Sequence, residues 1–211
     1  MRDNRAYVWG RDEVSRRPEY EWIERWIPPR ARVIDLGCGD GTLLRRLKDG
    51  RQIEERGIEL SPSGVEACRA KGLRVTLGAI DAPLADVPDD AFDYAVCNVT
   101  LQMVMRPEVL LREMRRVAPR QIVSFPNFAY VVNRLELLLR GRMPRRLLYG
   151  YRWYDTGHIH QLSIADFEET VRDLGLAVQD ARYFGPAGPL ARLAPNLWAH
   201  EALLLLRRAG G

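Results

Sequence analysis

Apolar runs of strand length alternate with amphipathic stretches along much of the chain. Between the runs, leucines recur at helical spacing, as at Leu43, Leu44 and Leu47. The runs that have the length of buried strands in the first part of the chain are 32–36, 55–60, 73–78, 92–98 and 121–125. Strands that alternate with helices in this way predict a parallel sheet with helices on both faces.

The alternation changes after residue 125. The later pattern predicts helices over 129–140 and 164–174, and strands over 176–184 and 200–206. Between the two helices, residues 142–162 show no regular pattern, and a segment of this length is often functional. We therefore expect residues 129–162 to form an insertion that covers the site as a lid.

Residues 1–30 are polar with aromatic insertions. Tyr20, Ile23 and Trp26 fall at helical spacing, which predicts a helix packed on the edge of the sheet. Alternatively, Tyr7 or Tyr20 closes over the carboxylate of a ligand. The 211 residues suit a single domain, with residues 1–30 as an N-terminal helical extension.

Three glycines follow the first predicted strand at alternate positions: Gly37, Gly39 and Gly41. A helix follows them, and we expect Gly50 to cap its end. Glycine lets a ligand approach the main chain closely, and the N-terminus of the helix presents free N–H groups. A dinucleotide fold uses G-x-G-x-x-G, whereas here the third glycine comes one residue early. Asp35 stands two residues before the first glycine.

The pattern over residues 35–41 resembles motif I of the class I S-adenosylmethionine (SAM)-dependent methyltransferases. Three further blocks look like the methionine-biosynthesis MetW family: Ser-Phe-Pro-Asn-Phe at 124–128, Gly-Arg-Met-Pro at 141–144 and Trp-Tyr-Asp-Thr at 153–156. The resemblance runs from about Val33 to Leu174. It implies an α/β, Rossmann-like methyltransferase sheet, mostly parallel with an antiparallel last strand. It also implies association with homoserine O-acyltransferase.

Acidic residues at the ends of the second and third strands extend the predicted ligand site. Glu59 lies 18 residues after Gly41, close to the interval at which a carboxylate meets a ribose in βαβ nucleotide sites. The family resemblance implies that Asp81 accepts from the adenine amino group, with Ile80 against the ring. The predicted contacts to SAM, or to its product S-adenosylhomocysteine (SAH), are Asp35, Gly37, Cys38, Gly39, Gly41, Glu59, Leu60, Ile80, Asp81 and Asn98.

His160, Tyr154 and Asn127 are the candidate catalytic residues on the acceptor side. The pKa of a histidine lies near neutrality, so His160 is the best general base. The alternative is that His160 is a hydrogen-bonded residue that fixes the lid to the sheet. The other polar groups suited to line an acceptor pocket are Tyr154, Asp155, Asn127 and His158. The chain has three histidines and no cysteine or acid at ligand spacing, so we expect no metal site.

Arginines cluster in and beside the insertion: Arg140, Arg142, Arg145, Arg146 and Arg152. Three interpretations remain open. The cluster is a solvated face, a site that recognises a carboxylate or phosphate, or a docking surface for an acidic partner or RNA. No RNA-binding motif accompanies the cluster, so nucleic acid is not the favoured partner.

Composition narrows the class of protein without deciding the function. Hydrophobic residues make up 46% of the chain and the net charge is only +4, typical of a globular domain without a dominant basic surface. Cys38, Cys68 and Cys97 show no paired spacing, which indicates a reducing compartment. The longest apolar run, 202–206, is too short to span a membrane, and the first residues lack a signal-peptide pattern. We expect a cytoplasmic protein with no membrane partner.

The leading hypothesis is a SAM-dependent methyltransferase that acts on a small molecule, linked to methionine biosynthesis through the MetW resemblance. The first alternative is a SAM-binding, non-catalytic partner or regulator of homoserine O-acyltransferase. The second is an RNA methyltransferase. These hypotheses differ on the acceptor side, which the motifs do not define.

Overall fold

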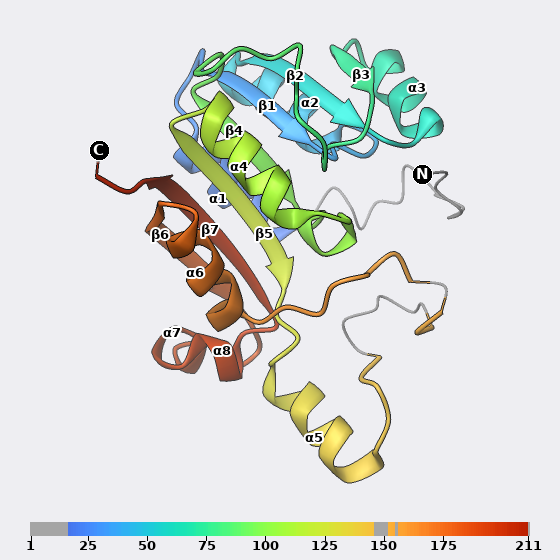
Figure 1. The fold of residues 1–211 in the computed structure, drawn as a ribbon, viewed down its shortest axis with the longest axis vertical. Coiled ribbons are helices and arrows are strands. Elements are labelled where there is room, and N and C mark those ends of the chain that lie inside the picture. The colour runs from blue at the N-terminus through green and yellow to red at the C-terminus, as the bar shows by residue number, and fades with distance from the viewer. Residues whose placement is uncertain (1–16, 146–151, 155, 211) are drawn as a thin grey trace.

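The computed structural model describes residues 17–145, 152–154 and 156–210 (Figure 1). The strands are β1 (Arg32–Leu36), β2 (Glu54–Glu59), β3 (Val75–Leu77), β4 (Tyr94–Asn98), β5 (Arg120–Pro126), β6 (Leu176–Phe184) and β7 (Glu201–Arg208). The helices are α1 (Pro18–Trp26), α2 (Thr42–Arg51), α3 (Pro62–Ala70), α4 (Pro107–Val117), α5 (Val131–Arg140), α6 (Ile164–Asp173), α7 (Leu190–Leu193) and α8 (Pro195–Trp198), with a 3₁₀ turn, η2 (Leu101–Met103).

The strands form one sheet in the order β3-β2-β1-β4-β5-β7-β6. All neighbouring pairs are parallel except those of β7, which runs antiparallel to both β5 and β6. The predicted α/β sheet with an antiparallel last strand is therefore confirmed. The chain direction across the sheet reverses between β1 and β4, and ligands of open α/β sheets bind at the carboxyl ends of strands beside such a point.

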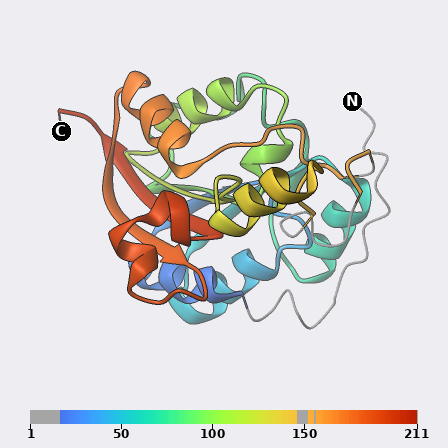
Figure 2. The same cartoon turned by 90° about the horizontal axis from the view of Figure 1, so that it is seen from below.

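Helices cover both faces of the sheet, as Figure 2 shows from below. Alternate residues of β1 supply the two cores, with Val33 on one face and Ile34 and Leu36 on the other. Side chains from α1, α2 and α3 pack on the Val33 face, and those from α4 and α6 pack on the opposite face. In the described part of the chain, every helix is too short or too polar to cross a membrane.

Helix α1 packs on the sheet and reaches its edge strand. Tyr20 and Ile23 are buried in the core beneath α1, and Trp26 Nε1 donates to Asp180 Oδ2 of β6 at 3.0 Å. This contact confirms the predicted helix at the sheet edge. Tyr7, the other aromatic residue considered for closing over a ligand, lies outside the described residues.

The end of α2 differs from the prediction. Gly50 lies inside the helix, and the left-handed cap is Gln52, with φ of 54° and its N–H bonded to Lys48 O. A Cβ atom on Gly50 would lie 2.6 Å from Glu24 Oε1, so the glycine makes room for the neighbouring α1 side chain. Gly50 thus serves helix packing, and the turn into β2 is made two residues later.

Backbone hydrogen bonds join the insertion to the residues that follow β4 and β5. Phe128, just after β5, donates its N–H to Leu162 O, and the N–H groups of Ile159 and His160 both donate to Gln102 O in η2. The described residues between α5 and α6 contain no helix or strand. Arg146 and Asp155 lie outside the described residues, so the extent of the predicted lid stays a prediction.

The left-handed cap of α2 gives a stability prediction. Gln52→Gly should raise the free energy of unfolding by about 0.5–1 kcal/mol, because glycine adopts positive φ without the steric cost of a Cβ atom. Thermal or denaturant unfolding measures the change. Gln52→Ala is the matched control, since it keeps the Cβ atom and should not share the gain. An equal gain in both variants would mean that strain at this residue is not the cause.

Candidate functional site

The loop between β1 and α2 has a backbone geometry that glycine adopts without strain. Gly37, Gly39 and Gly41 have positive φ angles of 83°, 59° and 76°. A Cβ atom on Gly37 would lie 2.4 Å from Thr100 Cγ2, and one on Gly41 would lie 2.5 Å from Leu73 Cδ1. The glycines therefore meet two requirements, the conformation of the loop and its close packing.

Hydrogen bonds tie this loop to the strands on either side of β1. Gly37 N donates to Ile58 O at 2.8 Å, and Gly39 N donates to Glu59 Oε2 at 2.8 Å, both at the end of β2. From the other side, Thr100 Oγ1, just after β4, donates to Gly37 O at 3.3 Å. The residues after β4 thus lie beside the glycine loop.

Glu59 has the geometry expected of a residue that accepts two hydroxyl groups. Its side chain is 7% exposed, and its second oxygen, Oε1, accepts from Ser61 N at 2.8 Å. A carboxylate has about four acceptor positions, more than the bonds to Gly39 and Ser61 occupy. These bonds also fix the carboxylate at the mouth of the glycine loop, where the sequence predicts a ribose.

Asp35 is a buried carboxyl group with an unused acceptor. It is 2% exposed, and Oδ1 has no hydrogen-bond partner among the described residues. Burial, reinforced by the charge of Glu59, raises the pKa of Asp35 to about 7, from a usual value of 3.8. A buried, unpaired acceptor is costly, and a cationic donor would relieve that cost. The site therefore fits a ligand with an ammonium group.

The predicted adenine contacts, Ile80 and Asp81, follow β3, and Leu60, a further predicted ligand contact, follows β2. Leu60 is 38% exposed directly after β2, Ile80 is buried, and Asp81 is half-buried after β3. Asp81 Oδ2 accepts from Met105 N at 3.2 Å, which orients the carboxylate. An exposed leucine, a buried isoleucine and an oriented acceptor suit a flat ring with an amino group, as the sequence predicts.

Cys38 and Asn98 complete the predicted ligand contacts. The Cys38 thiol lies 3.9 Å from Cys68 Sγ, and a Cβ atom on Gly57 would approach it to 2.8 Å, so its side chain fills the space beneath the loop. The hydrogen bond with Cys68, together with burial, raises the pKa of the Cys38 thiol. Asn98 Oδ1 accepts from Ser124 Oγ at 2.7 Å. The Cys38 N–H donates to Ile58 O at 3.3 Å, so the described contacts of Cys38 serve the packing and conformation of the loop.

Two residues after β4 were not among the predicted site residues. Val99 has φ of 50°, a strained angle for a β-branched residue, and such strain concentrates at functional sites. Gln102 is buried, donates from Nε2 to Val99 O, and accepts the two N–H bonds from the insertion through its own carbonyl oxygen. The positive φ of Val99 could not be predicted from the sequence. Gln102 could have been proposed as a site residue, because it closely follows the predicted end of a strand.

The three predicted catalytic residues are not joined by any hydrogen bond or ring contact within the described residues. Asn127 is fully buried, and its amide donates to the carbonyl oxygens of Ala199 and Asn196 at 2.8 and 3.1 Å, so its geometry is that of an architectural residue. Tyr154 is 60% exposed and accepts from Arg152 Nη1. His160 is exposed and held through its backbone. Their catalytic roles stay predictions.

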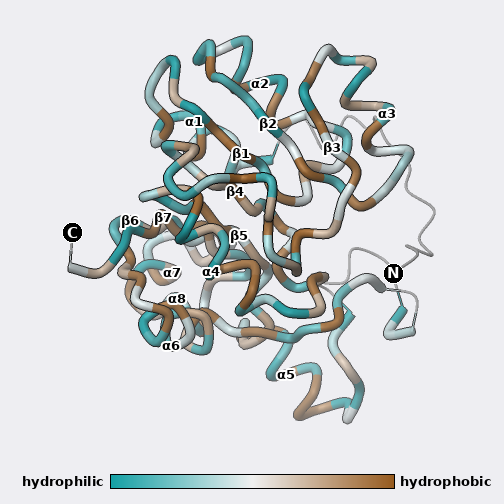
Figure 3. Tube along the Cα trace, turned by 45° about the horizontal axis from the view of Figure 1, so that its top comes forward, coloured by the Kyte–Doolittle hydropathy of each residue, from teal (hydrophilic) through white to brown (hydrophobic). Residues whose placement is uncertain are grey.

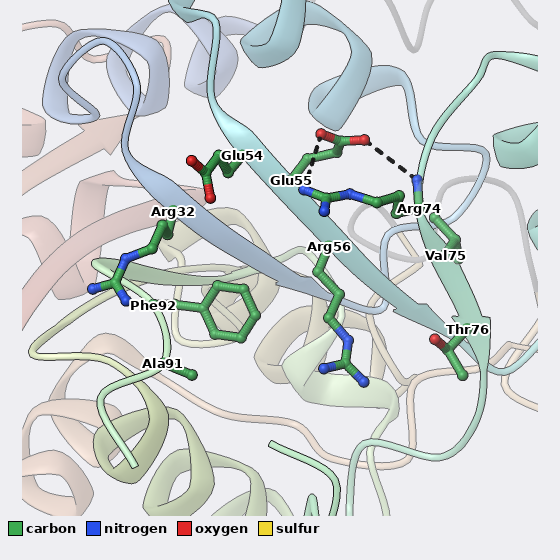
Figure 4. Close-up of a pocket in the computed structure, with 9 residues that line it drawn as sticks. All are labelled: Arg32, Glu54, Glu55, Arg56, Arg74, Val75, Thr76, Ala91 and Phe92. Atoms are coloured by element: carbon green, nitrogen blue, oxygen red, sulfur yellow. Dashed lines mark hydrogen bonds and ion pairs between the residues drawn. The ribbon is translucent and has the colours of Figure 1, made fainter. Parts of the chain in front are cut away.

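A separate pocket of about 420 Å³ lies at the amino ends of the strands (Figure 4). It is lined by Arg32, Glu54, Glu55, Arg56, Arg74, Val75, Thr76, Ala91 and Phe92. None of these is a predicted site residue, and the ion pairs Arg32–Asp93 and Arg74–Glu55 neutralise part of its charge. The described residues hold no group of three or more His, Cys, Asp or Glu side chains suited to a metal ion.

A family model described as methionine biosynthesis protein MetW matches residues 17–206. The chain belongs to the MetW family. A relative from Rhodopirellula baltica, named as a bifunctional methionine biosynthesis protein MetXA/MetW, is 30% identical over 99% of this chain, which covers 35% of that protein. The chain spans only about a third or less of the length of the first curated relatives it matches.

Solved structures similar to this MetW-family chain are SAM-dependent methyltransferases and related proteins. A SAM-dependent methyltransferase from Mesorhizobium loti gives a TM-score of 0.63 at 18% identity, covering 90% of this chain and 98% of the other. The cyclase SpnF gives a TM-score of 0.64 at 18% identity, covering 92% and 81%. The chain has the class I methyltransferase fold, and this fold also occurs in a protein named as a cyclase.

Glu59→Ala should weaken the binding of SAM and SAH by about 1.5–3 kcal/mol, or about 10- to 150-fold, because hydrogen bonds to a charged acceptor would be lost. Titration calorimetry measures the change. Glu54→Ala is the matched control, since Glu54 is an exposed glutamate at the opposite end of the same strand. An unchanged affinity in a folded Glu59→Ala protein would remove Glu59 from the ligand site.

The raised pKa of Asp35 predicts a pH dependence. Only the carboxylate attracts an ammonium group, so SAM affinity should fall as the pH drops below about 7, by up to about tenfold per unit. Asp35→Asn should weaken binding and flatten this profile, whereas Asp86→Asn, on an exposed loop, should change neither.

The same Asp35 carboxyl group affects the stability of the ligand-free protein with the opposite trend. Its folded pKa lies above the unfolded one, so the folded state holds more protons and stability should fall as the pH rises from about 4 to 7. Asp35→Asn should reduce that decline in a thermal unfolding series.

For the binding prediction, a wild-type profile of SAM affinity that is flat between pH 5.5 and 7.5 would contradict the assignment of Asp35 to the ammonium group.

Proposed function

We propose that this MetW-family chain binds SAM at the carboxyl ends of β1, β2 and β4 and transfers its methyl group to a small-molecule acceptor. The observation that carries the proposal is the pairing of a buried, unpartnered Asp35 with an oriented Glu59 across the glycine loop. Asp35 suits the ammonium of the methionine moiety, and Glu59 suits the ribose hydroxyls. The two groups lie at the carboxyl ends of neighbouring strands, so that one ligand could contact both.

The residues of the site would act mainly by positioning. When bound, SAM supplies an electrophilic methyl group on a sulfonium, which an acceptor attacks in line to release SAH. The protein must then align the acceptor and exclude water. The glycine loop and Asp81 would hold the nucleoside, while the segment anchored on Gln102 lies at the end of β4, beside the loop. A general base is needed only if the acceptor carries a proton of high pKa.

Two separate observations support a place in methionine biosynthesis and a small-molecule acceptor. The family description and the name of the Rhodopirellula baltica relative both refer to methionine biosynthesis. The net charge is only +4, from 32 lysines and arginines against 28 aspartates and glutamates, whereas an RNA acceptor would favour a strongly basic surface.

A second function is favoured by the relative in which a MetW segment is joined to a MetXA segment. In that function, the chain is a SAM-binding partner of homoserine O-acyltransferase and needs no acceptor site. It is supported by the observation that no hydrogen bond or ring contact within the described residues joins His160, Tyr154 and Asn127, since a sensor does not need these groups to converge. A partnership is also compatible with catalysis, so only a measurement of methyl transfer by the chain distinguishes the two functions.

The proposed function predicts binding of both SAM and SAH, and release of SAH from SAM in the presence of the acceptor. Calorimetry with each ligand tests binding, and an SAH-release assay in a metabolite extract tests transfer. Glu59→Ala should lose release in proportion to SAM occupancy. Absence of heat and of thermal stabilisation at millimolar ligand would contradict SAM binding. Binding without release in any extract, together with SAM-dependent activation of homoserine O-acyltransferase, would contradict catalysis and favour the second function.

A further inference from the structure

Helix α5 presents an apolar face to solvent. Leu138 and Leu139 are 78% and 77% exposed, Leu135 is 47% exposed, and Asn133 is the buried residue of the helix. Leu135, Leu138 and Leu139 follow i, i+3, i+4 spacing, so they lie on one side of the helix. We call these three residues the α5 leucine face. Figure 1 and Figure 3 show α5 standing away from the sheet.

Exposed leucines at this density are uncommon on a protein that functions alone. The hydropathy colouring of Figure 3 shows the apolar stretches of α5 at the edge of the molecule rather than against the core. Two further apolar side chains, Leu137 and Met143, are about half exposed on the same segment. Contiguous apolar surface of this kind marks an interaction site.

The charge around the α5 leucine face is positive. Residues 131–145 contain four arginines and one glutamate, a net charge of +3. The glutamate, Glu136, pairs with Arg140 at 3.8 Å, and Arg142 and Arg145 are exposed just beyond the helix. A partner surface that fits is therefore apolar at its centre and carries carboxylates at its rim.

This charge disfavours a second copy of the chain as the occupant. A two-fold contact between identical α5 faces would place the same arginines opposite one another, and such like-charge contacts are costly. The Rhodopirellula baltica relative instead supplies a different neighbour, because its MetW segment is covalently joined to a MetXA segment. A covalent joint keeps the two proteins close, and separate chains need a docking surface to achieve the same proximity.

We propose that the α5 leucine face is the docking surface for homoserine O-acyltransferase. The proposal rests on the partnership described above and adds the surface that carries it. The three leucines enter an apolar groove of the acyltransferase as one helix face, and the flanking arginines contact carboxylates at the rim of the groove. Four residues separate β5 from α5, and the insertion after α5 returns to Gln102, so the α5 leucine face belongs to the same segment of chain that borders the proposed SAM site.

The test uses purified homoserine O-acyltransferase from the same organism and measures its affinity for the full chain. Leu138→Glu/Leu139→Glu should weaken binding at least about 100-fold, the scale of losing central interface residues. Leu193→Glu in α7 is the matched control, because Leu193 is 81% exposed outside this face and should leave affinity unchanged. Arg142→Glu/Arg145→Glu should weaken binding by about tenfold and reduce its dependence on salt.

SAM titration of the same variants separates this proposal from the proposed SAM site. Unchanged SAM affinity in the leucine variant, with lost acyltransferase binding, supports the docking surface. Equal acyltransferase binding by wild type and the leucine variant would overturn the surface while leaving the partnership intact. No binding by the wild-type chain would overturn both. Loss of self-association in the variant, or loss of binding to phosphatidylglycerol vesicles, without any acyltransferase binding would assign the face to another occupant and overturn the proposal.

Discussion

The hydrogen bond from Gly39 N to Glu59 Oε2 couples the conformation of the glycine loop to the end of the neighbouring strand. The loop needs glycines because its backbone has positive φ and because Thr100 and Leu73 leave no room for a Cβ atom. Glu59 holds the loop and also faces the predicted ribose position. On the proposed function, one carboxylate would therefore serve both the fold and the ligand.

The location of this site could be predicted from sequence, because its requirements are local. Alternate glycines and an acid at fixed spacing constrain the backbone over a few residues, and the strand-helix alternation brings the ends of β1, β2 and β4 together. The position of the α2 cap could not be predicted, because the choice between Gly50 and Gln52 depends on Glu24 of another helix and on the turn into β2.

The acceptor side was harder to predict because its polar residues are held by contacts with residues far away in the sequence. Asn127 follows a strand end, as a site residue would, yet its amide is bonded to the carbonyl oxygen of Ala199, 72 residues later. The leucines of α5 have the spacing of a core helix, and sequence alone does not reveal that their face is open to solvent. The role of Asn127 and the exposure of the α5 leucines thus depend on tertiary structure, which the local sequence pattern does not reveal.

The residues that suit SAM and the exposed apolar helix lie in two different parts of the molecule. The half of the sheet formed by β3, β2, β1 and β4 carries the residues that suit SAM, and the segment after β5 carries the exposed apolar helix and the arginines. The insertion contacts the first part through Gln102, whose carbonyl oxygen accepts from the N–H groups of Ile159 and His160.

A crystal structure of the chain with SAH tests the central claim most directly. The account predicts the ribose hydroxyls within hydrogen-bond distance of the Glu59 carboxylate and the amino group of the ligand paired with Asp35 Oδ1. Clear density for the ligand away from the glycine loop, or at the loop with the ribose and amino group on other residues, would contradict it.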